Sequence, residues 1–322
     1  MSILLETKNL KRYYGKGEVK AVDDITLQIK AGRSLALIGE SGSGKTTFGK
    51  LIAGLETPTA GKIFFQGEEI QELSVKKMRR IRKDMQMVFQ SSGGVFDPAY
   101  TIGESITEVL KNYEKLSARE YKKLVDNVLT RVGLGEEYGY RYARNLSGGQ
   151  CQRANIARAL VLRPKMVICD EPVSSLDYSI RKQILNLLKE MQKEFGITYL
   201  LITHDLSNVS YVCQEVAIMY AGQIVEMMDC TDDMKETALH PYSKLLFQSI
   251  PVQSPRDRKK LDEWRSQGIG MTFSVGCNFQ SRCEKCTERC RQEKPLLKEI
   301  TAGHKVACHC YEEENKNTGE KR

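Results

Sequence analysis

The feature that most constrains this 322-residue chain is a glycine-rich loop between a buried strand and a helix. The loop runs from Gly39 to Thr46, reads GESGSGKT, and matches the phosphate-loop pattern in full. The apolar run 34–38 before it predicts a buried strand, and residues 45–53 predict a helix that Gly54 ends. A phosphate loop in this context predicts an α/β fold with a parallel sheet.

The residue types of the loop indicate its chemistry. Its glycines allow successive backbone N–H groups to converge on phosphate oxygens, and the helix N-terminus adds a partial positive charge. Lys45 is expected to reach the β- and γ-phosphates of a nucleotide, and the Thr46 hydroxyl is expected to bind Mg²⁺.

Two further buried strands are predicted at residues 166–169 and 198–202, with helical periodicity between them that completes a βαβ unit. Asp170 and Glu171 end the first strand, and His204 follows the second. We expect Asp170 to hold the Mg²⁺ shell and Glu171 to polarise an attacking water. His204 is expected to contact the γ-phosphate and orient that water.

Size and charge limit the function classes. The chain exceeds one typical domain, so a large core with a smaller appendage is expected. No apolar run reaches the roughly 20 residues that cross a bilayer, and the apolar stretch at the N-terminus is too short for a signal peptide. Together these features predict a cytoplasmic location. Basic clusters at 76–83 and 256–260 are either solvated helix faces or contacts to phosphate or anionic lipid, and they do not indicate nucleic acid.

Cysteine usage is lopsided along the chain. None of the ten cysteines precedes Cys151, and six crowd the C-terminal stretch: Cys277, Cys283, Cys286, Cys290, Cys308 and Cys310. Without a secretory signal, metal ligation is favoured over a disulfide framework.

The ordered set of motifs resembles the nucleotide-binding subunit of ATP-binding-cassette transporters over roughly residues 3–235. The set comprises the phosphate loop, the LSGGQ segment 146–150, Asp170-Glu171, the SLD segment 175–177 and the THD segment 203–205. The resemblance implies a P-loop NTPase core with an antiparallel β subdomain and a helical signature subdomain (about 91–160). Together they form a cassette domain over residues 1–236.

The same resemblance implies a role for each site residue. A second cassette grips the γ-phosphate of ATP through LSGGQ, so ATP closes a dimer and hydrolysis opens it. Tyr14, with Tyr13 as the less favoured choice, is expected to stack on adenine, and Gln90 to sense Mg²⁺ and contact the membrane partner. The implied ATP-binding residues are Tyr14, Gly39, Ser41, Gly42, Ser43, Gly44, Lys45, Thr46, Thr47, Gln90, Asp170, Asp177, Ser147, Gly148, Gly149 and Gln150. Those implied in catalysis are Glu171, His204, Lys45 and Gln90, and those implied for Mg²⁺ are Thr46, Gln90 and Asp170.

The C-terminal part of the chain indicates which subfamily of transporter ATPases it resembles. The HPYSKLL segment 240–246, and the later Gly276-Cys277, Arg282-Cys283, Cys290 and 306–308, resemble the extension of oligopeptide and dipeptide permease ATPases. The segment 169–174 is closer to the second of the two ATPases of such systems. The resemblance implies a Cys-rich extension over 237–322 and a peripheral place on the cytoplasmic face of the membrane. It implies as partners a second cassette in a heterodimer, two integral membrane permeases and, indirectly, an external solute-binding protein, without nucleic acid.

The spacing of the C-terminal cysteines predicts a metal site. Cys277, Cys283, Cys290 and Cys308 resemble the four-thiolate iron–sulfur site of this subfamily. Thiolates suit a [4Fe–4S] cluster and also tetrahedral zinc, and reduced thiols without a metal are the third alternative. Cys286 and Cys310 lie outside this spacing.

The chain departs from the family pattern at two places. Segment 91–98 differs from the family pattern after Gln90, and Cys151 stands where Gln or Arg is more common; we expect that cysteine to be inert.

The alternative to a transport function is a soluble cassette protein that acts on ribosomes or DNA, but such proteins usually carry two cassettes or a coiled-coil insertion. A third hypothesis is a metal-sensing module built on the cysteines, but it would leave the presence of the catalytic Glu171 unexplained. The transported solute is not fixed by the sequence, because the cassette never touches it.

Overall fold

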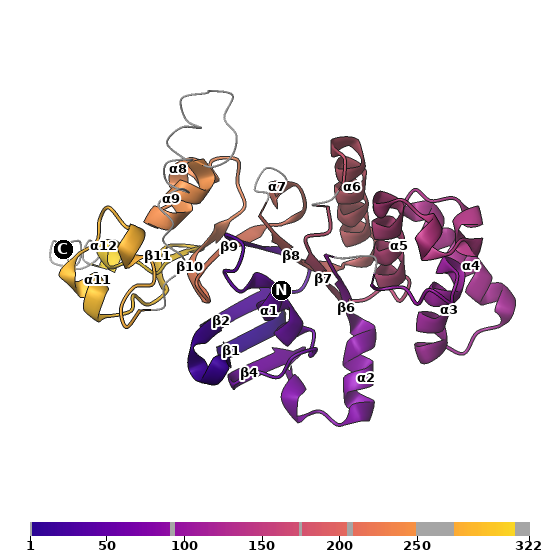
Figure 1. Ribbon diagram of the computed structural model, residues 1–322, viewed down its shortest axis with the longest axis horizontal. Helices are drawn as coiled ribbons and strands as arrows, with labels where there is room; N and C mark the ends of the chain where they lie inside the picture. The colour runs from indigo at the N-terminus through magenta and orange to yellow at the C-terminus, as the bar shows by residue number, and fades with distance from the viewer. Residues whose placement is uncertain (1, 91–93, 174–175, 205–208, 249–273, 313–322) are drawn as a thin grey trace. The chain divides into compact units, whose positions relative to one another are not determined.

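A computed structural model describes residues 2–90, 94–173, 176–204, 209–248 and 274–312 (Figure 1). It divides into two compact units, each built from separate stretches of the chain. Unit 1 is Met1–Leu5, Ile29–Ser34 and Phe64–Thr203, and unit 2 is Glu6–Gln28, Leu35–Ile63 and His204–Arg322. In the described part of the chain, no helix is both long enough and apolar enough to cross a membrane.

Unit 1 contains three parallel strands: β6 (Met85–Val88), β7 (Met166–Asp170) and β8 (Thr198–Thr203). Both β7 and β8 are buried along their whole length, as their continuous apolar runs predict for parallel strands. Helix α6 (Tyr178–Phe195) connects them and ends at Gly196, which takes a left-handed φ of 67°. The predicted βαβ unit is therefore confirmed.

The other helices of unit 1 are α2 (Val75–Asp84), α3 (Ile102–Tyr113), α4 (Ala118–Arg131) and α5 (Gly148–Leu160). Three of them begin with a capping box, in which a Ser or Thr side chain and a Glu or Gln three residues later satisfy each other's backbone N–H groups. The pairs are Thr101–Glu104, Ser117–Glu120 and Ser147–Gln150. These local signals explain where the three helices of segment 102–160 begin. Strand β5 (Glu68–Glu69) also lies in this unit.

The first two strands of the chain are long. Strand β1 (Ile3–Tyr14) and β2 (Val19–Lys30) each have 12 residues, with the turn Gly15–Gly17 between them. They lie in the order β2-β1-β4, where β4 is Ala60–Phe65. Buried apolar residues alternate along β2, because one face of the strand is covered and the other is solvated.

Another group of strands in unit 2 carries the phosphate loop. Strand β3 (Leu35–Ile38) runs parallel to β9 (Glu215–Tyr220), and helix α1 (Lys45–Ile52) follows β3 across the loop. Strand β10 (Gln223–Asp229) pairs antiparallel with β9. The strand and helix predicted around the loop are confirmed.

The C-terminal extension continues this sheet. Strand β12 (His304–Val306) pairs with β10 and with β11 (Lys298–Thr301), both antiparallel. The short helices of unit 2 are α7 (Val209–Val212), α8 (Met234–Thr237), α9 (Pro241–Gln248), α11 (Glu288–Gln292) and α12 (His309–Glu312). The expected boundary near Thr237 remains a prediction, and the chain on both sides of it belongs to unit 2.

Some of the residues singled out above lie outside the described residues. They are Ser91, Ser92 and Gly93 after Gln90, Ser175 of the SLD segment, Asp205 of the THD segment, and the basic run 256–260.

Candidate functional site

The phosphate loop lies between β3 and α1 in unit 2. Gly39, Gly42 and Gly44 have φ values of 157°, 82° and 105°. The buried Lys45 ammonium donates to the carbonyl oxygens of Gly39 and Glu40, at 2.7 and 2.8 Å, and lies 3.4 Å from the Ser43 hydroxyl. Lys45 is thus folded over the loop, where incoming phosphate oxygens can replace the carbonyls as its partners.

Two of these glycines are required by space as well as by φ. A Cβ at Gly44 would lie 1.9 Å from the carbonyl oxygen of Ala21, and one at Gly39 would lie 2.2 Å from that of Met219. The loop is therefore packed directly on neighbouring backbone. Ser41 and Gly42 are exposed at its tip, whereas Thr46 and Thr47 in the first turn of α1 are half-buried.

The two aromatic candidates for adenine stacking end β1. Tyr14 lies under the Arg12 guanidinium, 4.6 Å from ring centroid to Cζ, and its hydroxyl donates to the Glu56 carboxylate. The Tyr13 hydroxyl donates to Asp23 at 2.5 Å, and burial together with that carboxylate raises the pKa of Tyr13. The choice of Tyr14 for adenine stays a prediction.

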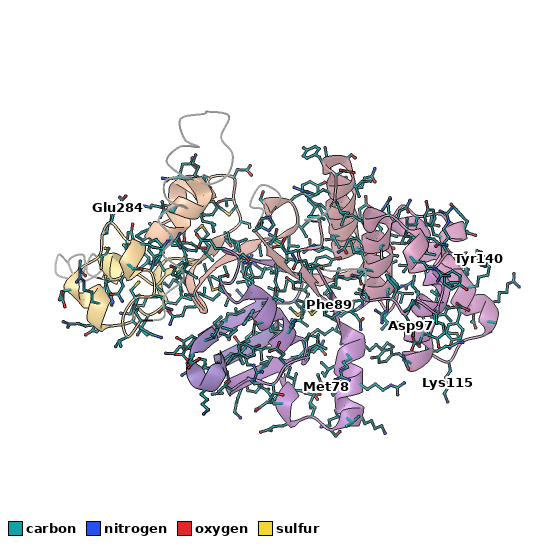
Figure 2. All side chains as sticks on the ribbon, viewed as in Figure 1. Met78, Phe89, Asp97, Lys115, Tyr140 and Glu284 are labelled. Atoms are coloured by element: carbon teal, nitrogen blue, oxygen red, sulfur yellow. The ribbon has the colours of Figure 1, made fainter. Side chains whose placement is uncertain are left out.

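In unit 1, predicted site residues gather where the parallel strands end. Register pairs Val88 with Cys169 and Asp170 with Ile202, so the carboxyl ends of β6, β7 and β8 meet at one edge. Asp170 is 3% exposed, and Gln90 is exposed just after Phe89, which Figure 2 labels. This edge presents a carboxylate and an amide oxygen, which are ligands suited to Mg²⁺.

Glu171 has an unusual backbone conformation. Its φ is 50°, in the left-handed region that non-glycine residues rarely adopt, and its N–H donates to the Ile202 carbonyl at 2.9 Å. A residue held in this way directs its side chain differently from the strand before it, which is a feature typical of functional positions. The role of Glu171 as the group that polarises water stays a prediction.

The LSGGQ segment forms the start of α5. The Ser147 hydroxyl accepts from the Gln150 N–H at 3.3 Å, and the Gln150 side-chain oxygen accepts from the Ser147 N–H at 2.9 Å. Ser147 and Gly148 are exposed, and no described atom lies within 4 Å of a Cβ built on Gly148. A 13-residue helix thus presents its N-terminus, with partial positive charge and small residues, to the outside.

The remaining predicted residues are placed as follows. Asp177 is exposed and directly precedes α6, where its carbonyl accepts from the Arg181 N–H at 2.9 Å. His204 is exposed after β8. Cys151 is buried in α5, which agrees with an inert side chain. The roles of Asp177 and His204 stay predictions.

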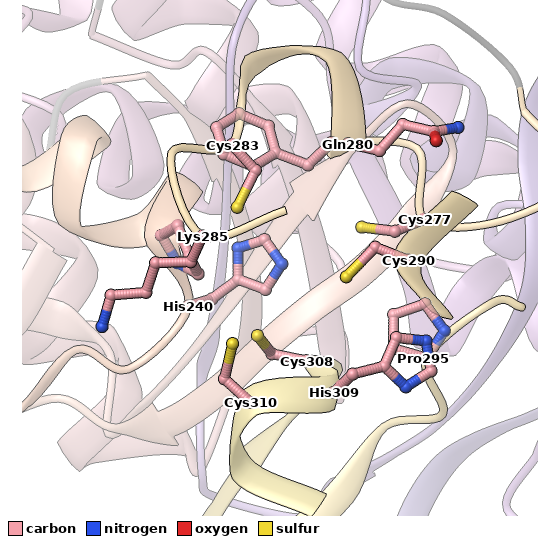
Figure 3. A pocket seen from close by; sticks show the side chains of 12 residues that line it. His240, Cys277, Gln280, Cys283, Lys285, Cys290, Pro295, Cys308, His309 and Cys310 are labelled. Atoms are coloured by element: carbon pink, nitrogen blue, oxygen red, sulfur yellow. The ribbon is translucent and has the colours of Figure 1, made fainter. Parts of the chain in front are cut away.

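The C-terminal cysteines line one pocket (Figure 3). The sulfur atoms of five of them point toward a common space: Cys277, Cys283, Cys290, Cys308 and Cys310. His240 and His309 also line it, whereas Cys286 is not one of its described lining residues. The predicted four thiols are brought together, and Cys310 joins them although the sequence spacing gave no reason to include it.

Burial controls the chemistry of these thiols. It raises the pKa of Cys277 to about 11 and that of Cys308 to about 12, with the neighbouring thiol groups contributing further. Cys277 and Cys308 therefore stay protonated at neutral pH unless a cation stabilises their thiolates. Among the described residues, no three His, Cys, Asp or Glu side chains are gathered closely enough to hold one metal ion.

Comparison with known proteins identifies the family. Residues 22–174 match the family described as ABC transporter, and residues 225–290 match the oligopeptide/dipeptide transporter C-terminal region. The chain is 39% identical over 321 residues to the oligopeptide transport ATP-binding protein AppF of Bacillus subtilis, covering 96% of this chain and 97% of AppF. It is 40% identical to the dipeptide transport ATP-binding protein DppF of Haemophilus influenzae, covering 95% and 96% of the two chains.

Solved structures give the same result. A dimeric ATP-binding cassette bound to ADP and Pi matches with a TM-score of 0.66 and 29% identity, over 71% of this chain and 99% of that cassette. This cassette is similar to the chain both in fold and in sequence, so the predicted P-loop α/β core is confirmed. This chain belongs to the ABC transporter family, as an ATPase of its oligopeptide/dipeptide branch.

Proposed function

We propose that this chain is the ATP-hydrolysing motor subunit of a membrane importer for peptides. The observation that carries the proposal is full-length similarity to peptide-transport ATPases together with an intact ATP-binding sequence. The exposed N-terminus of α5 supports the dimer part of the proposal, because it offers donors that a phosphate on a second cassette can use. The relatives AppF and DppF are named for oligopeptide and dipeptide transport.

We propose the following roles for the site residues in ATP hydrolysis. The phosphate loop and Lys45 bind the triphosphate, while Thr46, Gln90 and Asp170 would hold Mg²⁺, which neutralises charge on the β- and γ-phosphates. Glu171 polarises the attacking water, and His204 orients it. Ser147, Gly148 and Gly149 of the second cassette complete the site, with Asp177 at the dimer seam. Positioning and electrostatic stabilisation supply the catalysis.

We further propose the partners and the place of the chain. The second cassette is a different chain. Two integral membrane permeases contact the cassettes near Gln90, and the opening and closing of the cassette dimer moves them. An external binding protein delivers the solute. The chain acts from the cytoplasmic face of the membrane as a peripheral subunit. Residues 1–236 form the motor, with its signature subdomain at about 91–160, and 237–322 the extension.

Co-purification in mild detergent tests this assembly. We expect a second cassette and two integral membrane proteins in stoichiometric amounts. Recovery with ribosomes or DNA, and without membrane proteins, would instead establish the soluble-cassette alternative and remove the transport role.

We also propose that the cysteine pocket holds a [4Fe–4S] cluster. Five thiols point into one space, but they are not gathered around a single point as one zinc ion bound at about 2.3 Å would require. In a four-iron cluster each thiolate binds a different iron atom, so its ligands stand farther apart. Cys277, Cys283, Cys290 and Cys308 would be the ligands, and the cluster would staple the extension.

Iron and sulfide analysis of protein purified without oxygen tests this assignment. We expect about four irons per chain, retained in Cys286→Ser and lost in Cys283→Ser. Cys286 is the matched control because its sulfur lies outside the described lining of the pocket. Stoichiometric zinc, or no metal in anaerobic wild-type protein, would refute the proposal.

A further inference from the structure

The C-terminal extension reaches the phosphate loop through one side chain of that loop. Glu40 is the second loop residue, and both its carboxylate oxygens accept from Arg282, each at 3.0 Å. The two residues are separated by 242 positions in sequence, and both belong to unit 2. Two parallel hydrogen bonds between a guanidinium and a carboxylate fix orientation as well as distance.

Arg282 is held rigidly for this contact. Its side chain is only 13% exposed, and its guanidinium lies 5.7 Å from the ring centroids of both Tyr220 and Phe279. These rings pack against each other and against Tyr242, with centroids 4.6 to 5.6 Å apart. An arginine so confined loses little further freedom when it pairs with Glu40.

The extension touches the loop at a second point. The Glu40 N–H donates to the Tyr242 hydroxyl at 2.8 Å, so the backbone as well as the side chain of this loop residue is bound. The β9–β10 turn adds an indirect link, because Asn278 donates to the Ala221 carbonyl at 3.0 Å and the Gly222 N–H donates to the Ser43 carbonyl at 2.9 Å.

The charges explain what the contact does. Glu40 places a carboxylate in the loop that must accept a polyphosphate, and like charges repel across short distances. Arg282 compensates this charge by donating to both carboxylate oxygens. We propose that Arg282 is a positioning residue for ATP binding, which pairs with Glu40 and compensates its charge within the phosphate loop. The proposal does not depend on a metal in the cysteine pocket.

Binding of Mg²⁺ and a fluorescent ATP analogue to the full-length chain tests the proposal. Arg282→Gln leaves the Glu40 charge uncompensated and is expected to raise Kd about tenfold, or about 1.4 kcal/mol. The double variant Glu40→Gln/Arg282→Gln removes both charges and is expected to stay within about threefold of wild type. In ATPase assays the loss in Arg282→Gln should appear in KM, with kcat nearly unchanged.

Arg289→Gln is the matched control. Arg289 directly precedes Cys290, just as Arg282 precedes Cys283, but it pairs with the exposed Glu293 at 3.0 Å. Its removal should leave Kd unchanged. Wild-type affinity in Arg282→Gln, or equally weak binding in the double variant, would overturn the proposal. If Arg282→Gln does not fold, Arg282→Lys and the double variant decide: both must bind within about threefold of wild type, and a tenfold loss in either overturns it.

Discussion

The tight packing of the phosphate loop makes a quantitative prediction for two of its glycines. Gly42 and Gly44 both have positive φ, at 82° and 105°, so alanine at either position is strained by about 1 kcal/mol. No described atom lies within 4 Å of a Cβ on Gly42, whereas a Cβ on Gly44 would lie 1.9 Å from the Ala21 carbonyl oxygen and 2.8 Å from Met219 Cε. Backbone must move to relieve that overlap, which costs about 2 kcal/mol more.

Urea unfolding of the nucleotide-free chain measures this difference. Gly42→Ala should lower the free energy of unfolding by about 1 kcal/mol and Gly44→Ala by about 3 kcal/mol. Working without nucleotide separates the packing cost from any clash of the new methyl group with phosphate. Equal losses in the two variants, or a larger loss in Gly42→Ala, would refute the reasoning.

Two other predictions concern catalysis and acid stability. Glu171→Gln should bind ATP normally and accumulate an ATP-bound dimer with its partner cassette, seen by size-exclusion chromatography; undiminished ATP turnover would remove Glu171 from the mechanism. Burial raises the pKa of Asp23, but hydrogen bonds from Lys294 and Tyr13 outweigh it and leave the pKa below its usual 3.8. Asp23 therefore stabilises the fold above about pH 3.8 and loses this effect as pH falls through its folded pKa. Asp23→Asn should cost about 2 kcal/mol at pH 7 and less below pH 3.8, and a deficit independent of pH in urea unfolding would contradict this.

Local sequence signals predicted much of the core. The phosphate loop with its strand and helix, and the βαβ unit of β7, α6 and β8, follow from continuous apolar runs, glycines at the right positions and helical periodicity. The start of α5 is equally local, because Ser147 and Gln150 cap it within one turn. Such features need no information from distant parts of the chain.

The contribution of the extension could not be predicted in the same way. Strand β12 has only three residues, too few for a period, and its pairing with β10 is fixed by contacts far along the chain. Cys310 falls outside the recognised spacing, yet the start of α12 brings it into the pocket with Cys308. The Arg282–Glu40 pair joins residues that only the folded sheet brings together. Charge at either position alone gave no signal of it.

Peptide uptake by cells of the source organism tests whether this chain powers peptide import. The chromosomal copy is replaced by Glu171→Gln, and uptake of labelled di- and oligopeptides is compared with that of wild type at matched protein levels. We expect uptake of at least one peptide class to be lost, and to return when the wild-type chain is supplied. Undiminished uptake of every peptide class would contradict a peptide-import motor.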